Sequence, residues 1–336
     1  EDIFVHKMDS SGNLIWCKTF GGSTGDTGES ITIDNSGYIY TAGMFSGSVD
    51  FDPGPGTSFH TSTGNHDVFV HKMDSSGNFI WCKTFGGTLQ ENVKEIIIDN
   101  SNNIYIAGYF GDTVDFDPGT NTHQLSAVGS DELFVQKMDS SGNFIWAKSF
   151  GADLHGEWVS SLALDSSSNV YTTGYFRGTG DFDPGTGIFN LTSAGFGFDS
   201  FIHKMDSSGN FIWVKSFGKI NNHTTSSHIA VDAPGNIYCI GKFLDTVDFD
   251  PGTGTENGTS AGERDVFLQK LDLNGDFVWK QCIGSTGQDQ GVSLSVDASN
   301  NTFTVDLDVA SCSCTSGSGI MILTNGGEFI GLFDDS

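Results

Sequence analysis

Short runs of alternating apolar and polar residues recur along the whole chain, and they come in pairs that flank a brief polar segment. The clearest copy, KMDSSGNFIW, occurs unchanged three times, beginning at Lys72, Lys137 and Lys204. Looser copies begin at Lys7 and Lys270. Two alternating runs around Asp, Ser, Gly and Asn predict a tight β-hairpin, because Asp accepts from backbone amides ahead of it and Gly supplies a left-handed residue. No segment shows convincing helical periodicity.

A second hairpin signature alternates with the first. Its five copies read ITIDNSGYIYTAG, IIIDNSNNIYIAG, LALDSSSNVYTTG, IAVDAPGNIYCIG and LSVDASNNTFTVD. We name the expected strands a (ITID), b (YIYTAG), c (FVHKM) and d (LIWCKTF). Five phenylalanines mark one equivalent position of strand c, about 65 residues apart: Phe4, Phe69, Phe134, Phe201 and Phe267. The two signatures together predict one four-stranded unit per period.

Four-stranded units that repeat without helices are typical of a β-propeller, in which radial repetition protects the sheet edges. We therefore predict one all-β propeller domain over residues 1–336, with repeats starting near residues 2, 67, 132, 199 and 265 and a degenerate one near 319. The chain opens on strands c and d, which gives five complete blades plus one half blade, at six blade positions. Either the chain is a fragment of a larger protein or the ring has one irregular blade. The repeated Trp, with the stem of the Lys two residues later, is expected to pack between blades.

These repeats resemble a known family. The pattern D-x-F-V-x-K-M-D-x-S-G-N-F-I-W…F-G-G, followed by V-D-x-S-G-N-x-Y-x-x-G, is similar to the bacterial SBBP-type β-propeller repeat over nearly the whole chain. The resemblance implies a secreted or cell-surface protein of the kind frequent in Bacteroidota, where such chains are often exported by type IX secretion through a C-terminal sorting domain. No such domain is visible before the chain stops at GLFDDS. The family offers no catalytic residues to carry over.

Charge narrows the range of partners. The net charge of −27 argues against nucleic acid and anionic membranes, which need basic patches, so we expect neither as a partner. No apolar run approaches the roughly 20 residues that span a bilayer, and no signal peptide is visible. The acidic, Gly-rich chain suits an extracellular or outer cell-surface location in a bacterium. Cys17 and Cys82 share a repeat position with Ala147 and Val214, which indicates small apolar fillers rather than a disulfide framework.

Topology places the d–a and b–c loops on one face of a propeller, where a binding surface is expected. The b–c loops carry DFDPG four times, and Pro-Gly predicts a type II turn. Two aspartates spaced two apart share a face of a strand, and paired carboxylates suit Ca²⁺. The candidate calcium ligands are Asp50, Asp52, Asp115, Asp117, Asp181, Asp183, Asp248 and Asp250. In the alternative interpretation these aspartates cap turns and bind no ion.

Other candidate sites are weaker. His155, Glu157 and Trp158 form one irregular polar and aromatic group. In one interpretation this group binds a sugar, and in the other it is only a loop whose sequence departs from the repeat. Thr113 and Thr246 stand in Asp-Thr-Val triplets that resemble the O-glycosylation site of Bacteroidota. Histidines at one position of strand c alternate with glutamines, which indicates hydrogen bonding between blades; they are His6, His71 and His203, against Gln136 and Gln269.

Two functions remain open. The first is a non-catalytic extracellular module for binding, adhesion or surface assembly, with a protein, a surface glycan or further domains of the same parent chain as partner. Docking onto a type IX secretion complex is a version of this role that rests on family analogy. The alternative is a carbohydrate-active hydrolase or lyase whose acids come from the d–a loops: Asp26, Glu29, Glu91 and Glu157. Near-identical repeats and the lack of any catalytic motif favour the first.

Overall fold

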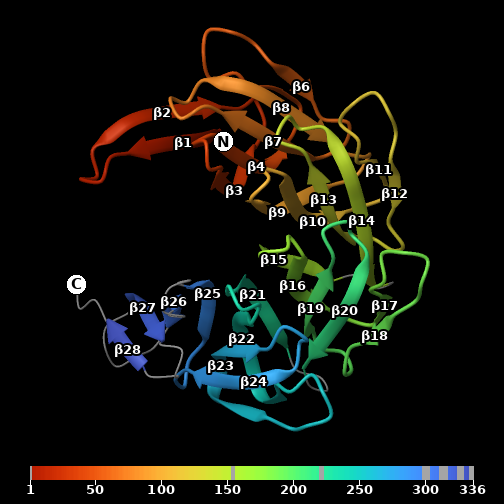
Figure 1. Cartoon of the computed structure of the whole chain (residues 1–336), viewed down its shortest axis with the longest axis vertical. Coiled ribbons are helices and arrows are strands. Elements are labelled where there is room, and N and C mark those ends of the chain that lie inside the picture. Colours follow the sequence, from red (N-terminus) through yellow and green to blue (C-terminus); the bar gives the residue numbers. More distant parts are fainter. Residues whose placement is uncertain are drawn as a thin grey trace. The chain divides into compact units, whose positions relative to one another are not determined.

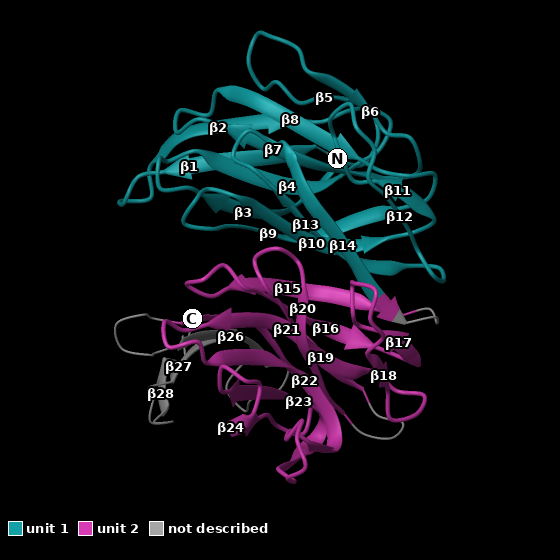
Figure 2. Cartoon of the chain, turned by 45° about the vertical axis from the view of Figure 1, so that its right-hand side comes forward, with its two compact units in different colours: residues 1–150 teal, residues 151–336 magenta. Residues whose placement is uncertain are grey.

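The computed structural model describes residues 2–152, 156–218 and 223–296, together with the strands at 303–309, 317–323 and 329–332 (Figure 1). Every regular element in these described parts is a β-strand, and neighbouring strands pair antiparallel. The chain divides into two compact units, Glu1–Phe150 and Gly151–Ser336 (Figure 2). This all-β architecture of antiparallel four-stranded sheets is consistent with a β-propeller. The expectation of a single domain over residues 1–336 stays a prediction.

The N-terminal unit begins with the hairpin of β1 (Ile3–Met8) and β2 (Leu14–Phe20), which form a two-stranded sheet. Two four-stranded arrangements follow. The first has the order β3 (Thr27–Ile33), β4 (Ile39–Phe45), β7 (Asp67–Met73), β8 (Phe79–Phe85), and the second the order β9 (Glu91–Ile98), β10 (Ile104–Phe110), β13 (Glu132–Met138), β14 (Phe144–Ala152). Each order is a–b–c–d, as the hairpin patterns predict.

The C-terminal unit repeats the same order three times. Its sheets are β15 (Trp158–Leu164), β16 (Val170–Phe176), β19 (Asp199–Met205), β20 (Phe211–Phe217); then β21 (Thr224–Val231), β22 (Ile237–Asp248), β23 (Asn257–Leu271), β24 (Phe277–Ile283); and β25 (Asp289–Val296), β26 (Phe303–Val309), β27 (Gly317–Leu323), β28 (Phe329–Leu332). The last two strands correspond to the degenerate copy that begins at Ile320, so that copy also forms a hairpin.

The tight turns follow from their Asp and Gly residues. In the turn between β7 and β8, one carboxylate oxygen of Asp74 accepts hydrogen bonds from the amides of Ser76 and Asn78, at 2.8 and 2.9 Å. Gly77 adopts a φ of 77°, in the left-handed region that favours glycine. The same local hydrogen bonds recur in the other turns, so they fix the hairpin register without help from distant residues.

In four of the five sheets, a glycine on strand b sets the distance of that strand from strand c. Gly43 lies opposite Phe69, and a Cβ at this glycine would lie 2.7 Å from the Phe69 ring and 2.0 Å from the Thr27 carbonyl oxygen. Only glycine therefore fits where the phenylalanine ring crosses strand b. The same pairing recurs as Gly108 with Phe134, Gly174 with Phe201 and Gly241 with Phe267.

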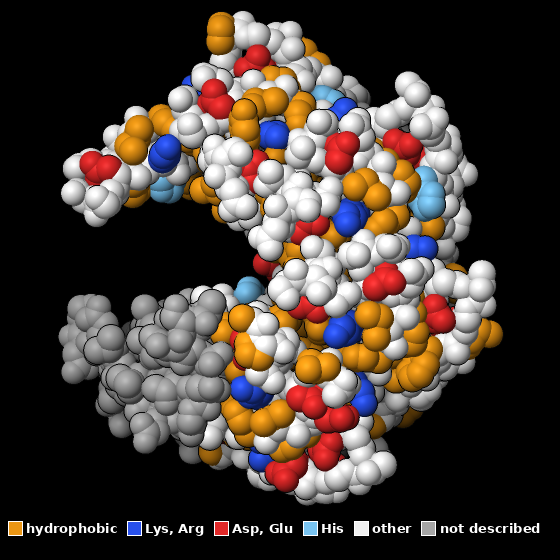
Figure 3. Space-filling model, in the orientation of Figure 1, with side chains coloured by type: hydrophobic (Ala, Val, Ile, Leu, Met, Phe, Trp, Pro, Cys, Tyr) orange, Lys and Arg blue, Asp and Glu red, His pale blue; other side chains and the backbone are white. Residues whose placement is uncertain are grey.

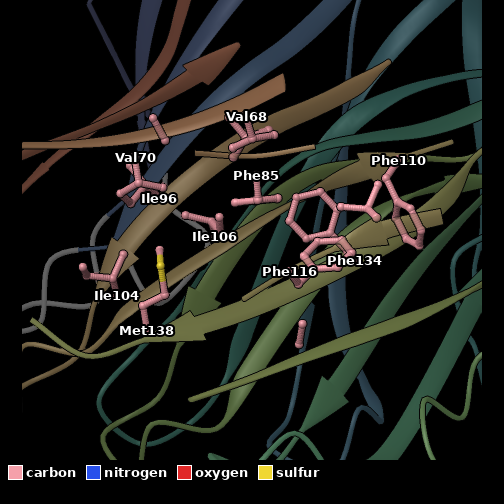
Figure 4. Packing of buried hydrophobic residues seen from close by; sticks show 14 of the residues in the cluster. Val68, Val70, Phe85, Ile96, Ile104, Ile106, Phe110, Phe116, Phe134 and Met138 are labelled. Atoms are coloured by element: carbon pink, nitrogen blue, oxygen red, sulfur yellow. The ribbon is translucent and has the colours of Figure 1, made fainter. Parts of the chain in front are cut away.

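The core lies between successive sheets and is rich in aromatic and β-branched side chains. Figure 4 shows one cluster in the N-terminal unit, where Phe85, Phe110, Phe116 and Phe134 pack with Ile106 and neighbours. Phe116 belongs to a DFDPG segment, and its ring centroid lies 5.0 Å from that of Phe134. The phenylalanine of DFDPG is therefore a core residue that ties the long b–c loop to strand c.

The repeated Trp and Lys pack against the next sheet, as predicted. A Cβ on Gly142, in the turn of the second sheet, would lie 2.9 Å from Cγ of Lys83 and 3.3 Å from the ring of Trp81. Lys72 also reaches across and donates from Nζ to the carbonyl of Ser140 at 2.9 Å. Its ammonium lies 4.7 Å from the centroid of the Tyr40 ring. The contacts with the turn of the second sheet join one sheet to its successor within a unit, whereas the contact of Lys72 with Tyr40 lies within the first sheet.

The b–c loops carry small hairpins of their own: β5 (Ser48–Asp50) with β6 (Phe59–Thr61), β11 (Thr113–Asp115) with β12 (Gln124–Ser126), and β17 (Thr179–Asp181) with β18 (Asn190–Thr192). Nε2 of His71 lies 3.0 Å from the carbonyl oxygen of Phe51 on such a loop. Gln136 bonds to Phe116 in the same way. The predicted hydrogen-bonding role of the His and Gln position is confirmed. The partner, however, is the loop of the same repeat rather than a neighbouring blade.

A candidate binding site of aromatic and basic residues

An aromatic group lies at the loop ends of the third and fourth sheets, in the C-terminal unit. Trp158 begins β15, and its ring centroid lies 5.2 Å from that of Tyr175 at the end of β16. Phe198, just before β19, lies 5.2 Å from Tyr175 and 6.1 Å from Trp158. His223, just before β21, lies 5.1 Å from Phe198. All four side chains are partly exposed, so they form an accessible surface. We call it the loop-face cluster.

Two arginines lie near members of this cluster. The guanidinium of Arg177 lies 5.7 Å from the centroid of the Phe198 ring. Burial first, and then the positive charges of Arg264 and Arg177, hold the pKa of His223 below its ordinary value. Arg264 also lowers the pKa of Lys242, after burial. Both arginines of a chain whose net charge is −27 therefore stand within electrostatic reach of one histidine.

The chemistry of the loop-face cluster suits binding. Trp, Tyr and Arg dominate the energetics of protein interfaces because they offer large, stiff contact areas with a polar end. Here the cationic group of Arg177 lies over one ring of the cluster, that of Phe198, and would attract a carboxylate-bearing segment against the prevailing acidity of the surface. The cluster thus combines apolar contact area with a local charge that differs from the rest of the molecule.

Only Trp158 of this cluster was predicted from the sequence. The other members stand at repeat positions that vary between copies: Tyr175 corresponds to Met44, Tyr109 and Lys242, and Phe198 to His66, Asp131 and Arg264. The sequence did contain a signal for a basic site, since Arg177 and Arg264 both fall outside the repeated Lys positions. The spatial meeting of b–c and d–a loops could not be read from one-dimensional spacing.

Glu157, a second residue of the predicted group, does not line the cluster surface. Glu157 is buried, with 2% exposed. It occupies the repeat position of Asp26 and Glu91, whose carboxylates accept hydrogen bonds from the amides of Gly22 and Gly87. Its position therefore indicates a structural acid below the loop. His155 lies outside the described residues.

Burial also shapes the electrostatics of the other acids on the d–a loops. Desolvation, together with the nearby negative charge of Asp67, raises the pKa of Glu91 to about 7. Asp26 is 4% exposed, and Glu29 forms an ion pair with Lys94 at 3.5 Å. These carboxyl groups hold loop backbone or pair with lysine, and their exposure gives no support to a hydrolytic role.

The DFDPG aspartates are engaged with backbone amides. One oxygen of Asp50 accepts from the amides of Asp52 and Ser58, at 3.1 and 2.7 Å, and Asp52 accepts from Gly54 at 2.8 Å. The same three bonds recur around Asp115 and Asp117, Asp181 and Asp183, and Asp248 and Asp250. Within the described residues, no three His, Cys, Asp or Glu side chains are grouped to hold a metal ion. Calcium binding stays a prediction.

The predicted type II turn at Pro-Gly was wrong. That geometry needs a positive φ at the glycine, and Gly54 is not among the residues with one. The hydrogen bond from its amide to Asp52 closes the turn instead. The hydrogen bond from the Gly54 amide to the carboxylate of Asp52 favours a different backbone conformation from the type II turn that Pro-Gly prefers, and the carboxylate bond determines the turn that forms.

The two threonines of the Asp-Thr-Val triplets pair with a hydroxyl on the neighbouring strand, across the β11–β12 hairpin for Thr113 and between β22 and β23 for Thr246. Oγ1 of Thr113 lies 2.8 Å from Oγ of Ser126, and Oγ1 of Thr246 lies 2.8 Å from Oγ1 of Thr259. Thr179 and Thr192, which lack such a triplet, make the same contact. Both hydroxyls thus have a structural role, and their glycosylation stays a prediction.

The cysteines that the structure describes are free thiols, which agrees with the interpretation of Cys17 and Cys82 as small side chains outside a disulfide framework. They are Cys17, Cys82, Cys239 and Cys282.

Comparisons with known proteins give a distant likeness to repeat proteins. The chain is 23% identical over 327 residues to an uncharacterized WD repeat-containing protein of Acanthamoeba polyphaga mimivirus, covering 81% of this chain and 23% of that protein. It is 24% identical over 153 residues to the regulatory protein FlaEY of Caulobacter vibrioides, covering 42% of this chain and 16% of that protein. The chain thus spans less than a quarter of the length of either relative.

No protein-family model matches the chain. The likeness to a WD repeat-containing protein and the repeated four-stranded sheets together fit a β-propeller. Among the described residues no helix is long and apolar enough to cross a membrane.

Proposed function

We propose that this chain is a non-catalytic β-propeller module that binds a protein partner through the loop-face cluster. The carrying observation is the convergence of Trp158, Tyr175 and Phe198 with Arg177 on one partly exposed surface. The likeness to a WD repeat-containing protein supports a β-propeller scaffold of this kind. The near-identical remainder of the repeats serves as a rigid support for this one irregular surface.

The repeat type, the number of blades and the cellular location are proposed from the sequence. We propose five complete blades and one half blade of the SBBP type, on a secreted or surface protein of a Bacteroidota-like bacterium that reaches the surface by type IX secretion. The repeat pattern and the acidic composition support this setting. A surface glycan is the second ligand class, because the adjacent, partly exposed rings of Trp158 and Tyr175 also suit sugar rings.

The enzyme alternative has less support. A glycosidase needs two carboxyl groups that reach the substrate, whereas Asp26, Glu91 and Glu157 are 4%, 0% and 2% exposed. We therefore propose that the loop acids maintain the loops on which the binding residues stand. Turnover of a polysaccharide that Glu157→Gln abolishes, in a variant that remains folded, would contradict this proposal.

The test is a selection of random dodecapeptides displayed on phage, followed by affinity measurements with the purified full chain. Peptides that bind should lose at least tenfold in affinity with Tyr175→Ala or Arg177→Ala. Acidic residues should be enriched among them, and their binding should weaken as salt rises.

The matched control is Tyr109→Ala, because Tyr109 occupies the same position of strand b in the second sheet. It should leave the affinity unchanged. Selected peptides that bind all three variants equally would place the binding surface elsewhere and contradict the proposal. A glycan array probed with the same variants distinguishes sugar from peptide as the ligand.

A further inference from the structure

Pairs of acidic side chains are buried where one sheet meets the next. In the N-terminal unit, Asp67 begins β7 and Glu91 begins β9, and they are 3% and 0% exposed. In the C-terminal unit, Asp265 of β23 and Asp289 of β25 are 3% and 1% exposed. By contrast, several acidic side chains (red) lie at the surface on the face drawn in Figure 3. We call Asp67 with Glu91, and Asp265 with Asp289, the junction acid pairs.

The two acids of the first pair meet at the d–a loop that follows β8. A Cβ on Gly86 would lie 2.5 Å from Oδ1 of Asp67, and the amide of Gly87 donates to Oε2 of Glu91 at 3.0 Å. The backbone joins the same two strands, because the amide of Glu91 donates to the carbonyl of His66 at 3.0 Å. Two successive glycines therefore leave room for two carboxyl groups at one loop.

The pair in the C-terminal unit is built in the same way. A Cβ on Gly284, just after β24, would lie 2.4 Å from Oδ1 of Asp265. The amide of the next residue, Ser285, donates to Oδ2 of Asp289 at 2.6 Å. The arrangement is thus a repeated feature of the fold, found in each of the two units.

The junction acid pairs have no basic partner. No lysine, arginine or histidine of the described residues forms an ion pair with any of the four acids. One carboxyl oxygen each of Glu91, Asp265 and Asp289 is buried and accepts no hydrogen bond within the described parts of the chain. A buried carboxylate in this state is strongly destabilising, whereas a protonated carboxyl group is neutral. Each pair therefore needs a bound proton or metal ion.

The geometry favours a proton. Ca²⁺ takes six to eight oxygen ligands, but the described residues contain no group of three acidic, His or Cys side chains that could hold a metal ion. Both oxygens of Asp67 already accept from the amides of Thr63 and Gly64. Electrostatics agree, because burial, together with the negative charges of Asp67 on β7 and Asp112 on the b–c loop, raises the pKa of Glu91 to about 7.

We propose that each junction acid pair binds one proton near neutral pH and that this proton holds the adjoining d–a loop in place. In the first pair the proton, taken from solvent, resides on Oε1 of Glu91, while Oε2 keeps its hydrogen bond to Gly87. When the proton leaves, two negative charges repel each other across the buried junction, and the loop at Gly86 and Gly87 opens. The pair is thus a pH-sensitive switch in the fold.

One junction lacks such a pair and offers an internal comparison. Thr224 of β21 occupies the position of Glu91, and Asp199 is the acid on strand c. Phe198 and His223 of the loop-face cluster directly precede these two residues. Because threonine does not ionise, no pair of negative charges forms at this junction. The switch is therefore independent of the proposed binding surface.

The direct test is a carbon-13 NMR titration of the full chain, labelled at the glutamate carboxyl carbons and assigned with Glu91→Gln. Glu91 should titrate near pH 7. Asp67→Asn should move this midpoint to lower pH, because it removes a negative charge. After correction for the intrinsic rate, hydrogen-exchange protection of the Gly87 amide should fall at least tenfold between pH 6 and pH 8.

Three results of the titration would overturn the proposal. One is a Glu91 midpoint below pH 5, which would mean that the buried pair is fully ionised at neutral pH. The second is a midpoint that Asp67→Asn leaves unchanged, which would mean that the two acids do not act as a pair. The third is a midpoint that added calcium chloride lowers, which would assign the site to a metal ion.

Stability provides a second test. The folded pKa of Glu91 is about 7 against an ordinary 4.5, so its stabilisation is complete below pH 4.5 and is lost as the pH rises to about 7. Over this range the unfolding equilibrium constant of the natural chain, relative to that of Glu91→Gln, should rise up to roughly 300-fold. Glutamine stays neutral and still accepts from Gly87, so this variant should fold.

Urea denaturation between pH 4.5 and pH 8 measures this change. The matched control is Thr224→Val at the equivalent position, which should keep the pH dependence of the natural chain. The comparison with Glu91→Gln cancels the opposite effect of the buried histidines, which both proteins share. Equal pH dependence in the natural chain and in Glu91→Gln would overturn the proposal.

Discussion

The hairpins β1–β2 and β7–β8 are nearly the same sequence in two environments. Residues 3–20 and 68–85 differ only at Ile3/Val68 and Leu14/Phe79. Both pair in the same register, with Lys opposite Trp and a bulge after that Lys. Yet the strand c residues are buried throughout in β7, whereas in β1 Ile3 and Val5 are buried and the alternate residues Phe4, His6 and Met8 are exposed. Local sequence therefore decides the hairpin, and the neighbouring strand b decides whether that hairpin becomes part of a core.

The largest expected difference is at the phenylalanine of strand c. Phe69→Ala should lower the free energy of unfolding by about 3–5 kcal/mol, because it leaves a cavity in a fully packed site. Phe4→Ala should cost less than about 1 kcal/mol, since most of that ring already faces solvent. Urea denaturation of both variants measures the difference. Equal costs would show that β1 is covered in solution.

The second difference is expected at the histidine that follows this phenylalanine by two residues, His71 in β7 and His6 in β1. We expect substitution of His71, but not of His6, to change how stability depends on pH. Burial lowers the pKa of His71 to about 4, against an ordinary value of 6.5. Because the folded pKa is depressed, stability is complete above pH 6.5 and is lost as the pH falls towards 4, by about 3 kcal/mol. His71→Gln should remove this loss, since Gln136 and Gln269 make the same hydrogen bond.

The matched control for this prediction is His6→Gln on the exposed strand, which should leave the acid sensitivity unchanged. Thermal unfolding between pH 4 and pH 7.5 compares the two variants. An unchanged acid loss in His71→Gln would mean that other groups carry it.

A smaller difference is expected at the lysine. Lys72 donates to Ser140 and lies over the Tyr40 ring, so Lys72→Met should cost about 1–2 kcal/mol. Lys7 makes the corresponding bond to the carbonyl of Ser75, at 2.9 Å, but faces no tyrosine ring in the described part of the chain. Lys7→Met should therefore cost about half as much. Chemical denaturation at low and high salt checks both values.

The smallest difference is expected at the solvent side of strand d. Ile80 and Ile15 are 40% and 55% exposed, and substitution of either by Ala should change stability by less than about 0.5 kcal/mol. A large cost at Ile80 alone would reveal an additional contact on the outside of the complete sheet. This pair therefore sets the baseline for the three larger comparisons.

Much of the fold was predictable because the decisive interactions are local. The aspartate and glycine of each turn fix the hairpins within five residues, and the alternation of Lys, Trp and Phe fixes their faces. The packing of Trp81 and Lys83 on the turn of the next sheet was also predicted. The Pro-Gly turn was mispredicted because the carboxylate of Asp52, two residues ahead of Gly54, overrides the backbone preference.

The candidate site was mostly hidden from the sequence. Trp158 was singled out, but Phe198 and His223 come from different loops, 40 and 65 residues later in the chain. Acids such as Glu91 seemed suited to catalysis, yet they are buried and hold the amide of a loop glycine. Spacing along the chain does not show which loop ends meet, nor which carboxyl groups face solvent.

The sequence by itself determined the hairpins, their registers and the period of about 65 residues, because turn chemistry and alternation act over a few residues. Only the tertiary structure decided which copies of the same strand are buried and which loop side chains converge. Burial depends on whether a neighbouring strand is present, and convergence depends on how sheets stack. The same phenylalanine is consequently a core residue at position 69 and an exposed one at position 4.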